Sequence, residues 1–159
     1  QEWANTDHAL FVGEKSQVQG TLRCSCDDKN VYFLVEVLDR SLLRGDYATV
    51  YLSPDDSKSL ANGAKRIQVS MDGLKSTETY AGKWNSAEMG VEVKTYVCND
   101  TNEDRIDNYG YIAEISIPRS SLTISSGQVL VNFSITDNKE EEAVSDVSSI
   151  SRWIPVAGL

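Results

Sequence analysis

Two tryptophans lie in polar stretches where their rings could bind a sugar. Trp84 stands in the sequence Ala-Gly-Lys-Trp-Asn-Ser of residues 81–86, and Trp153 follows the polar run of residues 145–152. An indole offers a flat apolar face that can stack on the C–H face of a sugar while its edge stays in water. These positions predict two loop tryptophans that flank one sugar site. The alternative at Trp84 is a loop that folds back on itself.

Arg66 and Asn85 are the predicted hydrogen-bonding partners of that sugar. Arg66 belongs to a predicted strand, and Asn85 adjoins Trp84. Burial of apolar surface contributes roughly 25 cal/mol per Å², so a partly covered indole face contributes about 1–2 kcal/mol. Two such faces predict weak binding, on the order of micromolar to millimolar. Replacing either loop tryptophan by alanine should weaken binding about tenfold or more and change the melting temperature little.

Acidic and amide residues concentrate in segments that could supply oxygen ligands to calcium. Residues 99–108 read Asn-Asp-Thr-Asn-Glu-Asp-Arg-Ile-Asp-Asn, and Ca²⁺ prefers oxygen ligands, although the spacing is not that of an EF-hand. The candidate ligands are Asp100, Asp104 and Asp107 in this segment, and Asp55 and Asp56 after an earlier predicted strand. A bound calcium ion would be structural. The alternative is a solvated acidic loop.

The sequence lacks the motifs of several enzyme classes. It holds no glycine-rich phosphate loop, no Gly-x-Ser-x-Gly and no His-Glu-x-x-His. Its one histidine, His8, lies near the N-terminus, and no Cys-x-x-Cys is present, which excludes a zinc site of the usual spacing. Twenty-four acidic residues guarantee that some two carboxylates have the separation that glycosidases use, so their number is uninformative. We assign no catalytic residue.

Length, composition and charge limit the partners. The 159 residues fit one globular domain, residues 1–159, and 40% hydrophobic residues can form a packed core. Lys and Arg number 15 against 24 Asp and Glu, and the net charge of −9 is the wrong sign for nucleic acid or anionic lipid. No apolar run approaches the roughly 18 residues of a membrane span. The chain begins at Gln1, and we expect a monomeric module of a larger or secreted protein, located outside the cytoplasm.

Alternating apolar residues, separated by Gly, Pro and Asp, divide the chain into short strands. Residues 31–39 are almost continuously apolar, which predicts a central strand covered on both faces, paired in a hairpin with residues 21–26. Asp72-Gly73 predicts a tight turn, and residues 119–122 a short helical turn. The other predicted strands are residues 47–52, 65–71, 90–97, 109–117, 128–136 and 152–159. The side chains predicted to point inward on four of them are Ile67, Val69 and Met71; Val91, Val93, Thr95 and Val97; Tyr111, Ala113, Ile115 and Ile117; and Val129, Val131, Phe133 and Ile135. About nine or ten strands predict an all-β fold, a two-sheet antiparallel β-sandwich of jelly-roll type.

The three cysteines are predicted to be thiols. Cys24 and Cys26 lie two residues apart on one strand, so their Cα atoms are about 7 Å apart, too far for a relaxed disulfide. Cys98 falls in the polar phase of its own strand. A bridge to it would require two different faces to meet.

Several segments in order resemble the family 9 carbohydrate-binding modules and the wider DOMON-like group of sugar- and haem-binding domains. They are Trp3; Cys26-Asp27-Asp28, followed by residues 31–32 and 35–39; Tyr51-Leu52-Ser53; residues 111–118 (Tyr-Ile-Ala-Glu-Ile-Ser-Ile-Pro); and residues 131–137 (Val-Asn-Phe-Ser-Ile-Thr-Asp). The resemblance implies a β-sandwich that binds sugars between two aromatic side chains, with structural calcium. Trp84 and Trp153 fall about where the two stacking aromatics occur in the family.

Two departures and three alternatives accompany the resemblance. Cys26 replaces the aromatic residue that commonly precedes the Asp, and residues 47–52 lack the acidic residues usual there. The predicted function is non-catalytic carbohydrate binding that tethers a larger enzyme or a cell surface to a glycan. The alternatives are a structural accessory domain, a small jelly-roll glycoside hydrolase, and a haem-binding DOMON-type domain with His8 and Met71 or Met89 as axial ligands.

Overall fold

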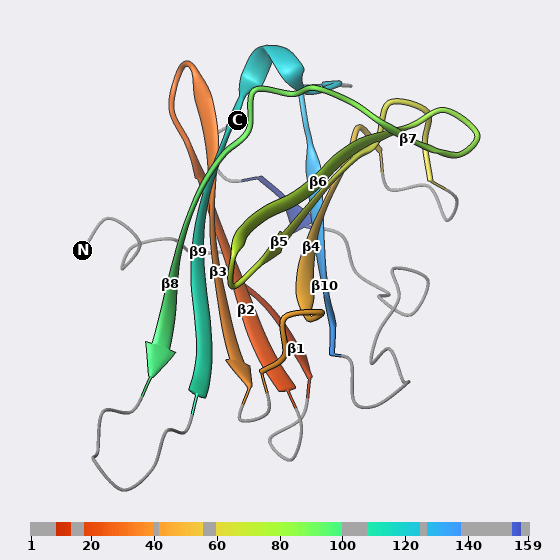
Figure 1. The fold of residues 1–159 in the computed structure, drawn as a ribbon. Helices are drawn as coiled ribbons and strands as arrows, with labels where there is room; N and C mark the ends of the chain where they lie inside the picture. The colour runs from red at the N-terminus through yellow and green to blue at the C-terminus, as the bar shows by residue number, and fades with distance from the viewer. Residues whose placement is uncertain are drawn as a thin grey trace, which may run out of the picture.

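The computed structural model describes residues 9–13, 18–39, 42–55, 60–99, 108–124, 127–137 and 154–156. These residues form eleven strands and one 3-10 turn, arranged as two antiparallel sheets that face each other (Figure 1). The predicted fold class, an all-β sandwich of two antiparallel sheets, is confirmed. Nowhere in these ranges is there a helix long and apolar enough to cross a membrane.

The first sheet has five strands. Their spatial order is β1 (Ala9–Gly13), β2 (Val18–Cys26), β3 (Asn30–Asp39), β9 (Asn108–Pro118) and β8 (Glu92–Asn99). The predicted hairpin of β2 and β3 is confirmed. Its turn is closed by Asp27, because Oδ1 of this residue accepts hydrogen bonds from the backbone N–H groups of Lys29 and Asn30, both at 2.7 Å.

The second sheet has six strands. Their order is β11 (Ile154–Pro155), β10 (Leu130–Thr136), β4 (Tyr47–Ser53), β5 (Lys65–Ser70), β6 (Gly73–Tyr80) and β7 (Trp84–Ser86). The predicted tight turn joins β5 to β6, where Gly73 has a φ of +115° that favours glycine. The predicted helical turn is the 3-10 segment Arg119–Ser121, directly after β9.

The core between the sheets contains the side chains predicted to point inward on three strands. They are Ile67 and Val69 on β5; Tyr111, Ala113, Ile115 and Ile117 on β9; and Val131, Phe133 and Ile135 on β10, with Val129 just before it. Each of these side chains is almost fully buried, whereas Met71, predicted to point inward with Ile67 and Val69, lies in the turn after β5 and is only partly buried. The period-two pattern therefore identified the inward face correctly.

Coverage of the outer faces differs from the prediction for two strands. In β3 only alternate residues are buried, from Val31 to Val37, while Leu38 is 58% exposed. The prediction of a strand covered on both faces was wrong for β3, because neighbours lie beside this strand and not over its outer side. In β10, by contrast, all seven residues are buried.

Two further details show how the sheets meet. Val97 on β8 was predicted to point inward but is 41% exposed, because β8 is an edge strand. Gly20 on β2 faces the other sheet, and a Cβ atom at this position would collide with Cδ1 of Ile135 on β10. The absence of a side chain at Gly20 lets the two sheets approach.

The cysteines are thiols in the described part of the chain, as predicted. Cys24 is buried, and Cys26 and Cys98 are partly exposed. Burial is the largest cause that raises the pKa of the Cys26 thiol. The sandwich is therefore held by packing of its two sheets, without a disulfide among the described residues.

Candidate functional site

The outer face of the six-stranded sheet carries polar and aromatic side chains. Residues directly opposite each other on antiparallel strands project to the same side of a sheet, so they form rows across it. One row contains Asn132, Tyr51, Arg66, Glu78 and Ser86. The next row on that side contains Ser134, Thr49, Gln68 and Ser76.

Trp84 is held at one end of this face by residues from three strands. Its ring centroid lies 5.3 Å from that of Tyr80, edge to face, and 6.2 Å from that of Tyr51, tilted by 53°. The guanidinium carbon of Arg66 lies 4.6 Å from the centroid of the Trp84 ring, a cation–π contact. Trp84 was predicted to lie in a loop; it lies in the short strand β7, because residues 84–86 pair with β6.

Arg66 and Glu78 form an ion pair beside the Trp84 ring. Nε of Arg66 donates to Oε2 of Glu78, and the two side chains are only 24% and 19% exposed. Because both side chains are mostly shielded from water, solvent ions screen this pair less than a fully exposed one. Next to it, Nε2 of Gln68 donates to Oγ1 of Thr49 at 3.4 Å, and Oγ of Ser76 donates to Oε1 of Gln68 at 2.8 Å.

This combination suits binding of a neutral polar ligand. A half-buried indole provides an apolar stacking surface, the guanidinium provides several hydrogen-bond donors, and the carboxylate provides acceptors. These groups already contact each other, so little side-chain freedom remains to be lost when a ligand arrives. Such a patch on an open sheet face is therefore a candidate binding site.

The predicted sugar-binding residues are only partly brought together. Arg66 and Trp84 are in contact, but Asn85 projects to the opposite side of β7 from Trp84 by strand alternation, and its Nδ2 donates to the carbonyl of Lys83 at 2.9 Å. Trp153 lies outside the described residues. The next residue, Ile154, pairs with Val131 on β10.

Three residues of this face were missed from the sequence. They are Tyr51, Glu78 and Tyr80. A signal for Tyr51 was available, because it is out of phase with the apolar residues Val50 and Leu52 of its own strand. Glu78 and Tyr80 required the register of the β5–β6 hairpin, which places Glu78 opposite Arg66.

Three buried carboxyl groups form a separate cluster at the strand ends. Asp39 ends β3, Asp46 precedes β4 and Asp137 follows β10; one oxygen of each lies within 4.8 Å of the others. Oxygens that share one calcium ion at 2.3–2.6 Å are at most about 5 Å apart, so the three side chains fit a single ion. Burial of Tyr111, reinforced by the charges of Asp46 and Asp39, raises the pKa of its phenol, whose Oη donates to the carbonyl of Val69 at 3.4 Å.

The predicted calcium ligands lie elsewhere. Asp55 is exposed at the end of β4, while Asp56, Asp100, Asp104 and Asp107 fall outside the described residues. The Asp39 cluster was not assigned from the sequence, although Asp39 and Asp137 each adjoin the end of an apolar strand. Their positions could have indicated a shared site, because strands that end at the same edge of a fold bring such residues close together.

The residues named for the haem alternative lie in different surroundings. Met89 is 4% exposed within the apolar core, and Met71 packs against that core from the turn between β5 and β6. His8 is outside the described residues. Both methionines therefore serve packing where the structure describes them.

Comparison with known proteins agrees with this description. The model of the family described as "Carbohydrate family 9 binding domain-like" matches residues 2–156. A curated relative, endo-1,4-beta-xylanase C of Paenibacillus barcinonensis, is 28% identical over 121 residues, which are 76% of this chain and 10% of the xylanase. The chain thus spans only a tenth of the length of that relative.

Two solved structures share the fold. Both are family 9 carbohydrate-binding modules from Caldicellulosiruptor kristjanssonii, one in complex with cellotriose and one with glucose. The TM-scores are 0.63 and 0.61, the identities 17% and 18%, and the alignments cover 90% of this chain and 72% and 73% of the respective modules.

The chain belongs to the carbohydrate family 9 binding domain-like family. The match covers nearly the whole chain, so the resemblance stated from the sequence is confirmed. The predicted class, a non-catalytic carbohydrate-binding module, is confirmed with it.

Proposed function

We propose that the face around Trp84 binds a neutral gluco-oligosaccharide. The observation that carries the proposal is the contact of Trp84 with Arg66, which is itself paired with Glu78 on an outer sheet face. The related modules in complex with cellotriose and with glucose support a glucose-type ligand.

Stacking and charge-assisted hydrogen bonds both contribute to binding. Arg66 lies over one face of the indole, so the sugar stacks on the remaining surface of Trp84. Arg66 donates to hydroxyl oxygens, and Glu78 accepts from hydroxyl groups. At roughly 25 cal/mol per Å², the stacked ring contributes about 1–2 kcal/mol, which gives affinities on the order of micromolar to millimolar.

Trp153 remains the proposed second stacking residue, and Asn85 a proposed polar contact. Support for Trp153 comes from its neighbour Ile154, which pairs with Val131 on β10. The residue after Val131 is Asn132, which lies in the same row as Tyr51 and Arg66. Asn85 is the weaker proposal, because its side chain is turned from the Trp84 ring by strand alternation.

Calorimetric titration with cellotriose tests the site. Trp84→Ala should weaken binding about tenfold or more, because about 1–2 kcal/mol of stacking is lost. Tyr96→Ala is the matched control, since Tyr96 is a 55% exposed aromatic residue on β8 in the other sheet. Equal affinity of the Trp84→Ala variant and the parent would reject this face as the site.

We further propose that the cluster of Asp39, Asp46 and Asp137 binds a structural calcium ion. Three carboxylates buried together repel one another, and a divalent cation relieves that repulsion. An ion that binds only the folded state at a hundred times its Kd adds about 2.7 kcal/mol. Chelation with EDTA should therefore lower the melting temperature by roughly 5–10 °C.

Two variants assign the ion to a site. Asp46→Asn should abolish the effect of EDTA, whereas Asp55→Asn, at an exposed position, should retain it. The reverse pattern would indicate that the ion binds at Asp55 and Asp56, the ligands predicted from the sequence. A melting curve that EDTA does not move, in protein purified without chelator, would remove the calcium proposal.

The wider role follows from the xylanase relative, of which this chain resembles one part. We propose that the module is monomeric, acts outside the cytoplasm and tethers a polysaccharide-degrading enzyme to its substrate. Retention of the chain on insoluble cellulose or xylan, weakened in Trp84→Ala, is expected. Elution as a dimer with the Trp84 face occluded would contradict the monomeric state.

A further inference from the structure

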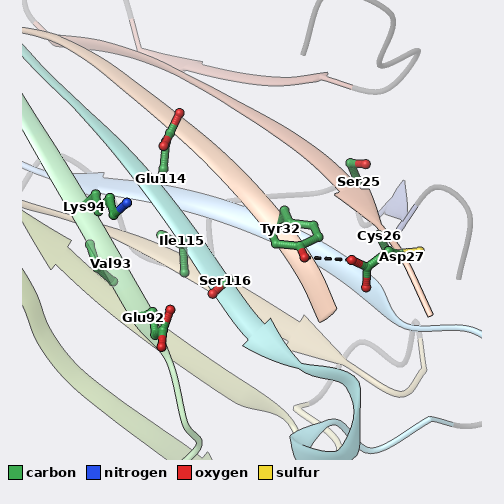
Figure 2. Close-up of a pocket in the computed structure, with 10 residues that line it drawn as sticks. All are labelled: Ser25, Cys26, Asp27, Tyr32, Glu92, Val93, Lys94, Glu114, Ile115 and Ser116. Carbon is green, nitrogen blue, oxygen red and sulfur yellow. Dashed lines mark hydrogen bonds between the residues drawn. The ribbon is translucent and has the colours of Figure 1, made fainter. Parts of the chain in front are cut away.

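A groove of about 490 Å³ lies on the other outer face of the sandwich, across β2, β3, β9 and β8. Figure 2 shows Tyr32, Ser116 and Glu92 along it, with Glu114 and Lys94 beside them. This volume is within the roughly 300–1,000 Å³ of small-ligand sites. The groove does not belong to the Trp84 face, because its strands form the five-stranded sheet.

The pairing register explains why the face is hollow there. Ser25, Tyr32, Ser116 and Glu92 lie directly opposite one another on the four strands and share one row. Ser116 has a short side chain between the long ones of Tyr32 and Glu92. The adjacent row places Glu114 opposite Lys94. Serine side chains therefore lie at the bottom of the groove, and an aromatic ring, carboxylates and an amine line its sides.

Tyr32 is fixed before any ligand arrives. Its Oη donates to Oδ2 of Asp27 at 2.7 Å and lies 3.3 Å from Nδ2 of Asn30. Hydrogen bonds to the carboxylate lower the pKa of Asp27 below its usual range. The largest contribution comes from the backbone N–H of Asn30, followed by the hydroxyl of Tyr32 and the backbone N–H of Lys29. Asp27 therefore stays ionised and keeps its hydrogen bond to Tyr32 at ordinary pH. A ring held in this way loses little freedom when a ligand stacks on it.

The charges of the groove select against anions. Three carboxylates, of Glu92, Glu114 and Asp27, line the groove together with the amine of Lys94. The only further cation bonded to these residues in the described structure is Arg119, whose Nη1 donates to the carbonyl of Asp27 at 3.0 Å, so negative charges still outnumber positive ones. Carboxylates and serine hydroxyls accept hydrogen bonds from sugar hydroxyl groups, and Lys94 and the serines donate. Uronic or sulfated sugars would meet like charge. The lining thus fits a neutral pyranose chain with one ring against Tyr32.

We propose that this groove is a second saccharide-binding site, which takes a segment of a neutral glycan chain. It deepens the proposed function and rests on it. Two sites on opposite faces of one module can engage two chains of a polysaccharide surface. Retention then exceeds the affinity of either site, because the second contact is intramolecular.

Titration calorimetry with cellohexaose and xylohexaose tests the groove. The parent chain should bind two oligosaccharides. Trp84→Ala and Ser116→Trp should each bind one, since Ser116→Trp fills the hollow from a half-exposed strand position. In the Trp84→Ala background, amide chemical shifts should move at Tyr32 and Ser116, and Tyr32→Ala should lose at least tenfold in affinity while Tyr32→Phe, which keeps the ring, loses less.

The outcomes separate the two sites. One bound oligosaccharide, lost in Trp84→Ala and unchanged in Ser116→Trp, overturns the groove and leaves the Trp84 site standing. One bound oligosaccharide with the reverse pattern supports the groove and rejects the Trp84 site. Absence of binding to both probes overturns both. Binding of spermidine by the groove without binding of either oligosaccharide overturns the saccharide assignment, because the carboxylates would then be a cation site.

Discussion

The two outer faces of the sandwich are built by the same strand alternation but differ in how their side chains are held. Around Trp84, residues from β4, β5, β6 and β7 contact one another through rings, an ion pair and hydrogen bonds. In the groove, Tyr32 is anchored by Asp27, whereas no described ion pair joins Lys94 to Glu114.

The difference predicts which of the two faces binds more tightly. A preassembled cluster has already lost most of its side-chain freedom during folding, so binding costs less. The long side chains of the groove must be ordered by the ligand, at about 0.5–1.5 kcal/mol each. We therefore expect the Trp84 face to bind its sugar more tightly than the groove does.

The largest effect should come from breaking the packing that both faces share. Gly20→Leu forces a side chain into Ile135 and Phe133 of the opposite sheet. The expected loss in the free energy of unfolding is about 3 kcal/mol, at the upper end of overpacking. Urea unfolding measures it, and Gln19→Leu, on the half-exposed side of β2, is the control. Equal stability of the two variants would show that the sheets can separate at Gly20 without cost.

The second largest effect is the loss of stability when an aromatic side chain is removed from one face or the other. Trp84→Ala removes two aromatic contacts and one cation–π contact, so it should lower the free energy of unfolding by about 1–3 kcal/mol. The sequence had predicted almost no change for a loop residue. Tyr96→Ala, at an exposed position on β8, should cost less than about 0.5 kcal/mol. Thermal or urea unfolding of both decides the comparison, and similar losses would contradict it.

A smaller effect tests whether preassembly matters for binding. Glu78→Gln removes the charge that pairs with Arg66 but keeps the size of the side chain. The affinity for cellotriose should fall about three- to tenfold, or about 0.7–1.4 kcal/mol, because Arg66 is then less ordered. Glu88→Gln, the same substitution at an exposed position after β7, is the control. Unchanged affinity in Glu78→Gln would show that the ion pair is structural only.

The smallest effect concerns the anchor of Tyr32 and its pH dependence. Because the folded state lowers the pKa of Asp27, the carboxylate stabilises the fold above the unfolded pKa of about 3.9 and loses this effect as pH falls through the folded pKa. Asp27→Asn should be slightly less stable than the parent at pH 7, and the difference should shrink below about pH 4. A difference that grows on acidification, measured by urea unfolding, would contradict the assignment.

Local alternation carried most of the fold prediction. The inward residues of β5, β9 and β10 were identified because successive side chains of a strand point to opposite faces, so the residues of the inward face recur with a period of two. The exposure of the outer face of β3 was not predicted, because the sequence shows only that Leu38 is apolar and not whether another segment covers it. Strand adjacency decides that question, and it is a property of the whole sheet.

Site residues were predictable only as individuals. Arg66 and Trp84 were each named, but their contact depends on the pairing of β5 with β6 and of β6 with β7. Glu78 is placed beside them by the pairing of β5 with β6, and Tyr51 by the pairing of β4 with β5. Asn85 was expected beside Trp84 because it is adjacent in the sequence, yet alternation sends neighbouring side chains of a strand to opposite faces.

By itself, the amino-acid sequence determined that this chain is an acidic all-β module, which strand faces lie inward, and to which family it is similar. Those properties depend on composition, on local alternation and on the order of short segments. Only the tertiary structure brought Asp39, Asp46 and Asp137 within reach of one ion, placed Glu78 against Arg66 and hollowed the face at Ser116. The acidic cluster and the groove depend on strands that are distant in the chain. The contact of Glu78 with Arg66 depends on the register of the β5–β6 hairpin, which shifts between Gln68 and Val69. No local pattern encodes either.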